Sequence, residues 1–121
     1  MMEHIDPRKS DVKLGRGGRN FLHHGNVRLR NEATRLAPTY GVATKMEKAN
    51  MIDNVLERLF EEDPPVRFLH LKRPLGGIQY WEEANRNSSR GKVSQDLRDA
   101  VRRMRHQERN AASMILNYAP K

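Results

Sequence analysis

The stretch that decides the fold reads Asp11-Val-Lys-Leu-Gly-Arg-Gly-Gly-Arg-Asn-Phe-Leu-His-His-Gly-Asn26. It holds four glycines, two arginines and two histidines between a strand-like start and the beginning of a helix. Glycine lets backbone N–H groups approach an anion closely, and the arginine guanidinium offers a rigid fork of donors that suits phosphate. The stretch therefore indicates either a phosphate-binding loop or a tight surface loop whose glycines only allow turns.

Length and composition limit what the chain can be. Its 121 residues suffice for one small domain with a modest core, and only 36% of them are hydrophobic. It contains no cysteine, which excludes disulfides and thiolate metal sites. No apolar run approaches membrane-spanning length, and the first ten residues lack the apolar stretch of a secretory signal. We therefore expect an intracellular protein with no membrane partner.

Positive charge is concentrated at the two ends of the chain. The net charge of +8 divides into +4 over residues 1–43, −2 over residues 44–83 and +6 over residues 84–121. This division suggests a polyanionic partner that touches the N-terminal loop and the C-terminal helix, and nucleic acid is the commonest polyanion. The alternative is a solvated basic surface that keeps the protein soluble.

Hydrophobic spacing and turn residues predict the first half of the domain. A short strand is expected at residues 11–14, followed by the Gly/Arg loop. Asn26 is expected to cap a first helix, which Pro38 would end because the residue before proline avoids helical geometry. A capping box at Thr44 then predicts a second helix over about residues 45–61.

The second half of the domain is predicted as a hairpin and a basic helix. Residues 66–71 and 78–82 are rich in β-formers, and the turn chemistry between them indicates a β-hairpin with a basic tip. An apolar stripe predicts a third helix over about residues 89–106. Residues 111–118 have helical spacing too, and either extend that helix or pack against a partner.

These elements predict an α+β fold: a small helical domain with a β-hairpin, in the order strand, helix, helix, hairpin, helix. The order is similar to that of a winged helix-turn-helix, although it lacks the usual leading helix and adds a trailing one. We expect a flexible tail at residues 1–10, a single compact domain at residues 11–106, and a helical extension or tail at residues 107–121.

Several segments together resemble an uncharacterised domain family that is abundant in diatoms and related algae. Its opening signature, D-V-x-x-G-R-G followed by H-x-G-N, is matched by Asp11, Val12, Gly15, Arg16, Gly17, His23, Gly25 and Asn26. Later matches include Arg67-Phe-Leu69, Trp81 and Lys92-Val-Ser-Gln95. The resemblance spans about residues 11–99 and implies a shared fold. It implies no activity, so the functional prediction rests on the residues themselves.

The chain lacks the motifs of common catalytic sites. No Gly-x4-Gly-Lys-Ser/Thr sequence occurs, and Asn20 stands where a dinucleotide fingerprint needs glycine. Adjacent His23 and His24 diverge in most backbones, so we expect no metal site, with His23 bonded to backbone and His24 exposed. We predict no enzymatic activity and no cofactor. Phe68 and Trp81 are expected in the core rather than on a stacking platform.

We therefore predict a nucleic-acid-binding domain, with duplex DNA favoured over RNA and a regulatory role in the nucleus. The candidate phosphate-binding residues are basic positions of the loop, the helices and the hairpin tip: Arg16, Arg19, Arg28, Arg30, Lys45, Lys48, Lys72, Arg73, Arg90, Lys92, Arg98, Arg102 and Arg105. The alternative is a non-enzymatic assembly subunit of a ribonucleoprotein or another large complex. In that case residues 107–121 would dock on a protein partner or a second copy.

Overall fold

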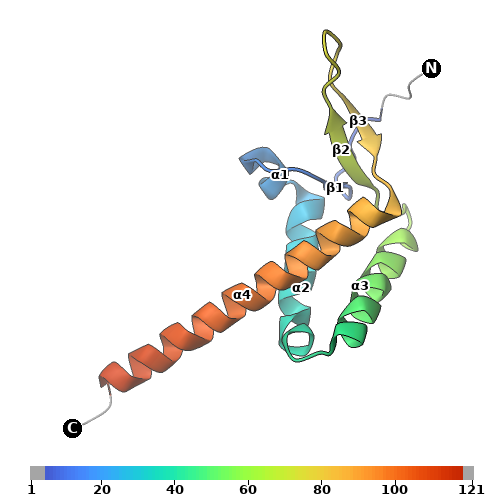
Figure 1. Cartoon of the computed structure of the whole chain (residues 1–121). Helices are drawn as coiled ribbons and strands as arrows, with labels where there is room; N and C mark the ends of the chain where they lie inside the picture. The colour runs from blue at the N-terminus through green and yellow to red at the C-terminus, as the bar shows by residue number, and fades with distance from the viewer. Residues whose placement is uncertain (1–4, 119–121) are drawn as a thin grey trace.

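The computed structural model describes residues 5–118, in which a three-stranded sheet lies at one end of four helices (Figure 1). The elements are β1 (Val12–Lys13), α1 (Gly18–Leu22), α2 (His24–Gly41), α3 (Lys45–Phe60), β2 (Phe68–Lys72), β3 (Tyr80–Glu83) and α4 (Arg86–Tyr118). The predicted α+β class is confirmed. The core lies between the sheet and the inner faces of α2, α3 and α4, where Phe68, Leu56 and Leu97 are buried.

Helix α2 differs from its prediction at both ends. It begins at His24, so the prediction of Asn26 as its N-cap is wrong. Pro38 lies inside the helix, so the predicted stop is wrong as well. Ala37 and Tyr40, on either side of Pro38, are buried in the core, and their packing outweighs the lost backbone hydrogen bond.

Helix α3 forms as predicted because its start is encoded locally. The Thr44 hydroxyl accepts a hydrogen bond from the Glu47 N–H at 3.2 Å, and the Glu47 carboxylate accepts one from the Thr44 N–H at 2.8 Å. The capping box is therefore confirmed. Ile52, Val55 and Leu56 form the buried face of the helix.

The sheet combines the predicted hairpin with the short first strand. Strands β2 and β3 are antiparallel, whereas β1 pairs parallel to β2 with Val12 opposite Phe68. Phe68 is buried as predicted, but Trp81 is only half-buried. Trp81 lies on β3, an edge strand, where the Lys13 ammonium is 5.1 Å from the centre of its ring.

The N-terminal segment predicted as a flexible tail, residues 1–10, contacts the domain from Ile5 onward. Ile5 forms an isolated β-bridge with Trp81. The Nε2 atom of His23 lies 3.1 Å from the carbonyl oxygen of Arg8, which agrees with the predicted backbone bond of that histidine. The first four residues lie outside the described part of the chain.

Helix α4 is one continuous helix rather than a helix with a separate C-terminal segment. It begins at Arg86, three residues before the predicted start at residue 89, because the Asn85 side chain accepts a hydrogen bond from the Ser88 N–H at 2.8 Å. The C-terminal part of the helix projects past the other elements (Figure 1), and every side chain from residue 105 to residue 117 is exposed.

Strand β1 is held by a group of buried contacts that we call the β1 clasp: Asp11, Gly25, Asn26 and Arg67. The Asn26 side chain accepts a hydrogen bond from the Lys13 N–H and donates one to the Lys13 carbonyl, each at 2.8 Å. Fully buried Asp11 accepts hydrogen bonds from Arg67 at 2.7 and 3.1 Å. Gly25 lies so close that a Cβ there would be 2.0 Å from the Asp11 carbonyl oxygen.

Replacing Gly25 by alanine is expected to destabilise the domain by several kcal/mol, because the new methyl would clash with backbone that no side-chain rotation can relieve. Chemical denaturation measures the loss. Gly91→Ala is the matched control: it lies in exposed helix with nothing within 4 Å of the new methyl. Alanine there should stabilise by roughly 0.5–1 kcal/mol. Equal effects of the two substitutions would contradict the close approach of α2 to β1.

Replacing Asp11 by asparagine is expected to cost about 3 kcal/mol at neutral pH, because Arg67 loses its buried partner. Burial raises the pKa of Asp11, but the hydrogen bonds from Arg67 and from the Arg8 N–H outweigh it and hold that pKa below its ordinary value of 3.8. The ionised carboxylate therefore stabilises the fold above pH 3.8, and this contribution is lost as the pH falls through the lowered pKa.

Urea denaturation of the wild type and Asp11→Asn should thus show a gap in free energy that narrows below pH 3.8. Asp53→Asn serves as the control, because Asp53 pairs with Arg90 at 3.0 Å on a half-exposed surface. Its cost should stay below about 1 kcal/mol. A gap for Asp11→Asn that is independent of pH would contradict the assignment.

Candidate nucleic-acid interface

Helix α4 presents two charged stripes on opposite sides of its apolar stripe. One stripe consists of Lys92, Asp96, Asp99 and Arg103. The other consists of Arg98, Arg102, Arg105 and Arg109. Both have steps of four, three and four residues, the spacing of side chains on one side of a helix. The first stripe lines a groove with the Gly/Arg loop, and the second lines a groove with the end of α2 and the start of α3.

The second groove, which we call the basic groove, has a volume of about 410 Å³. Its lining comprises Lys48, Arg98, Arg102, Arg105 and Arg109 together with Tyr40, Gly41 and Val101, and it includes no carboxylate. Arg105 donates a hydrogen bond to the Gly41 carbonyl at 3.1 Å, and Lys48 lies 5.3 Å from the centre of the Tyr40 ring. These two contacts orient the cations, while Arg102 contacts Asp99 outside the groove at 3.2 Å.

The first groove, which we call the loop groove, has a volume of about 630 Å³. The loop enters it through two residues with positive φ, Gly15 at 105° and Gly17 at 136°, a backbone region that other residues rarely adopt. The guanidinium carbon of Arg30 lies 3.6 Å from the centre of the Phe21 ring, an aromatic–cation contact at the mouth of the groove. Four cationic side chains line it: Arg16, Arg30, Lys92 and Arg103.

Asp96 is the buried polar group of the loop groove. Its side chain is only 5% exposed, and its Oδ1 atom pairs with the Lys92 ammonium at 3.1 Å. Its Oδ2 atom has no hydrogen-bond partner among the residues that the structure describes. Burial raises the pKa of Asp96, and the nearby charges of Lys92 and Arg30 offset only part of that effect.

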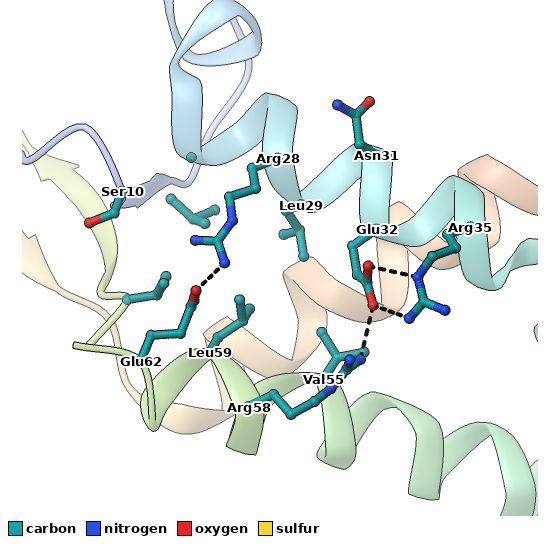
Figure 2. Close-up of a pocket in the computed structure, with 13 residues that line it drawn as sticks. Ser10, Arg28, Leu29, Asn31, Glu32, Arg35, Val55, Arg58, Leu59 and Glu62 are labelled. Carbon is teal, nitrogen blue, oxygen red and sulfur yellow. Dashed lines mark hydrogen bonds and ion pairs between the residues drawn. The ribbon is translucent and has the colours of Figure 1, made fainter. Parts of the chain in front are cut away.

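A third cavity, of about 540 Å³, lies between α2 and α3, and charged pairs cross it at both ends (Figure 2). Arg28 is bonded to Glu62 at one end. At the other end, Glu32 accepts hydrogen bonds from Arg35 at 2.6 and 3.0 Å and from Arg58 at 3.0 Å. These arginine bonds, with Arg35 first, hold the pKa of Glu32 below its usual range despite partial burial.

Each arginine of that cavity already contacts a carboxylate, and two glutamates offset its three arginines, so the cavity offers a polyanion far less positive charge than the basic groove does. Its floor is apolar and includes Leu29, Val55 and Leu59. The ion pairs at its ends hold α2 and α3 together across the cavity. Because its arginines serve this structural role, we exclude the cavity from the candidate interface.

Seven of the predicted phosphate-binding residues lie in two separate groups, one in each groove of α4. Lys48, Arg98, Arg102 and Arg105 meet in the basic groove, and Arg16, Arg30 and Lys92 meet in the loop groove. The Gly/Arg loop thus faces one side of α4, whereas Arg98, Arg102 and Arg105 face another. Sequence reasoning missed Arg103 and Arg109, although each continues the spacing of its stripe by four residues.

The remaining predicted residues lie elsewhere. Arg90 is bonded to Asp53 at 3.0 Å, and Arg28 is bonded to Glu62, so both link elements of the fold. The other four are surface positions outside both grooves: Arg19 on α1, Lys45 at the start of α3, and Lys72 and Arg73 at the tip of the hairpin.

A protein-family profile described as a domain of unknown function, DUF6824, matches residues 11–99. The chain belongs to this family. No curated protein and no solved structure matches the sequence. The DUF6824 match begins at Asp11 in the β1 clasp and ends at Asp99, so it contains nearly all of the loop groove. Three arginines of the basic groove, Arg102, Arg105 and Arg109, lie beyond the match.

Residues 5–118 contain no group of three or more histidine, aspartate or glutamate side chains arranged to hold a metal ion. None of the helices within those residues is both long and apolar enough to cross a membrane.

Proposed function

We propose that this DUF6824 protein is a non-enzymatic nucleic-acid-binding protein whose basic groove holds the phosphates of duplex DNA. The observation that carries the proposal is the lining of that groove, in which five cations from α3 and α4 occur without a carboxylate. Arginine and lysine side chains arranged in this way neutralise phosphates and release counterions, which is the main source of affinity for DNA.

The length spanned by the four arginines of the basic groove suits a duplex. At 1.5 Å per residue, Arg98 and Arg109 are about 16 Å apart along the helix axis. A length of duplex of about 16 Å carries roughly nine phosphates, enough to engage every cation of the groove. Contacts of this kind read the DNA backbone rather than its bases, so we expect sequence-tolerant binding with a regulatory or architectural role in the nucleus.

The double substitution Arg98→Gln and Arg102→Gln is expected to weaken binding to all duplex sequences alike. Each lost phosphate contact should lower the slope of log affinity against log salt by about one. Fluorescence anisotropy with a labelled duplex, titrated between about 50 and 200 mM salt, measures both the affinity and the slope.

The matched control is Arg35→Gln with Arg58→Gln, which removes the same charge from the α2–α3 cavity, where both arginines contact Glu32. This control should bind duplex almost as the wild type does. A similar loss in both double variants would mean that only net charge matters. Binding by the wild type that is weak and insensitive to salt would overturn the proposal.

The exposed end of α4 favours a second candidate function, that of an assembly subunit of a ribonucleoprotein or another complex. Met114, Ile115 and Leu116 are consecutive apolar side chains that remain exposed where α4 projects past the domain. Apolar surface of this kind commonly marks a protein contact. Under this alternative, basic ends would contact RNA or an acidic protein while the end of α4 docks on a neighbour.

For this second candidate, Ile115→Ser with Leu116→Ser should reduce the mass of any self-assembled species and leave duplex affinity intact. Light scattering coupled to size-exclusion chromatography measures that mass. Val42→Ser is the control, because Val42 is an exposed apolar residue at the α2–α3 turn, away from the projecting end. An unchanged mass in the double variant, with the wild type a monomer, would exclude self-assembly through this segment.

A further inference from the structure

Phe21 is an exposed aromatic residue with an organised surrounding. It lies on the short helix α1 after the glycine loop, and 58% of its surface is exposed. The Arg30 guanidinium lies 3.6 Å from the ring centre, so one face of the ring is covered by a cation. Among the described residues, Arg30 makes no ion pair that would draw it away. Phe21 is not among the residues that pack against the core, so its exposed surface is open to a ligand.

The surroundings of the ring are cationic. The loop groove that Phe21 lines also contains Arg16, Arg30, Lys92 and Arg103. Both of its carboxylates contact cations of the protein: the Oδ1 atom of Asp96 pairs with Lys92, and Asp99 contacts Arg102. The groove therefore combines an aromatic surface with cations, which is the arrangement that binds the bases and phosphates of single-stranded nucleic acid.

A second observation points to a ligand with N–H donors. Asp96 lines the groove, is 95% buried, and has an Oδ2 atom without a hydrogen-bond partner in the described chain. Buried polar atoms are nearly always satisfied, so an N–H group of an occupant that reaches this wall of the groove would complete the hydrogen bonding of Asp96. The edges of nucleobases carry such groups, whereas a sulfate or phosphate alone does not.

We propose that the loop groove binds an unpaired nucleobase of single-stranded nucleic acid, which stacks on Phe21 while the groove cations hold the adjoining phosphates. The site lies on a different side of α4 from the basic groove. This inference rests on the proposed function in one respect, which is that the ligand is a nucleic acid. The same protein then has one surface for a duplex and another for a strand whose bases are exposed.

Phe21→Ala tests the stacking, with Leu75→Ala as the matched control, because Leu75 is a fully exposed apolar residue at the hairpin tip and lines neither groove. The probes are a single-stranded DNA of about 12 nucleotides, the RNA of the same sequence, and the DNA duplex. Phe21→Ala should weaken binding to the single strands about tenfold or more, whereas Leu75→Ala should leave it unchanged. Circular dichroism checks that both variants fold.

A conservative variant supplies an independent measurement. Phe21→Trp keeps a stacking surface and should keep single-strand affinity, and its fluorescence should be quenched when the oligonucleotide binds. The wild type, whose only tryptophan is the half-buried Trp81, should show little quenching under the same conditions. A loss of affinity in the DNA arm or the RNA arm alone identifies which nucleic acid occupies the groove and supports the proposal.

The proposal is overturned if Phe21→Ala binds both single strands as the wild type does, or if it and Leu75→Ala lose affinity equally. It is also overturned if Phe21→Ala loses duplex and single-strand affinity to the same extent, since the site would then have no preference for exposed bases. Failure of the proposed duplex function gives a different result: the wild type would bind no duplex, while single-strand binding would still depend on Phe21.

Discussion

The close contact between α2 and β1 is the constraint on which the rest of the structure depends. β1 has only two residues, so its ladder to β2 cannot hold it alone. Gly25 brings the helix against the Asp11 carbonyl, and Asn26 pairs with both backbone groups of Lys13 in the manner of a neighbouring strand. Arg67 joins Asp11 to the start of β2. The clasp joins β1, which precedes the glycine loop and α1, to the start of α2, which follows them. It therefore also determines where the loop and Phe21 lie.

Helix α4 connects this arrangement to the charge of the surface. Its apolar stripe packs in the core, and the charged stripes beside it line two grooves. Several arginines outside the grooves contact carboxylates, as Arg28 does with Glu62 and Arg90 with Asp53. Exposed pairs of this kind add little stability. Their larger effect is on the electrostatic field, because they offset the positive charge of these arginines, whereas both grooves of α4 keep more cations than carboxylates.

Much of the fold could be predicted because its signals are local. The Thr44 capping box, the hairpin and the apolar stripe of α4 all appeared where spacing and turn chemistry placed them. The errors at Asn26 and Pro38 share a cause. Each residue has a strong local preference, but distant contacts use it differently, through the bonds of Asn26 to β1 and through core packing around Pro38.

For the candidate sites, the sequence by itself determined the arginine spacing on α4, the glycine-rich character of the loop and the excess of positive charge at both ends. Helical periodicity makes such rows visible because it depends only on residues three and four apart. Only the tertiary structure decided which cations are neutralised and which face of α4 each row occupies. It also decided that Phe21 lies against Arg30 beside buried Asp96. These relations join residues far apart in the chain, and their geometry follows from how the β1 clasp and the core orient α2 and α4.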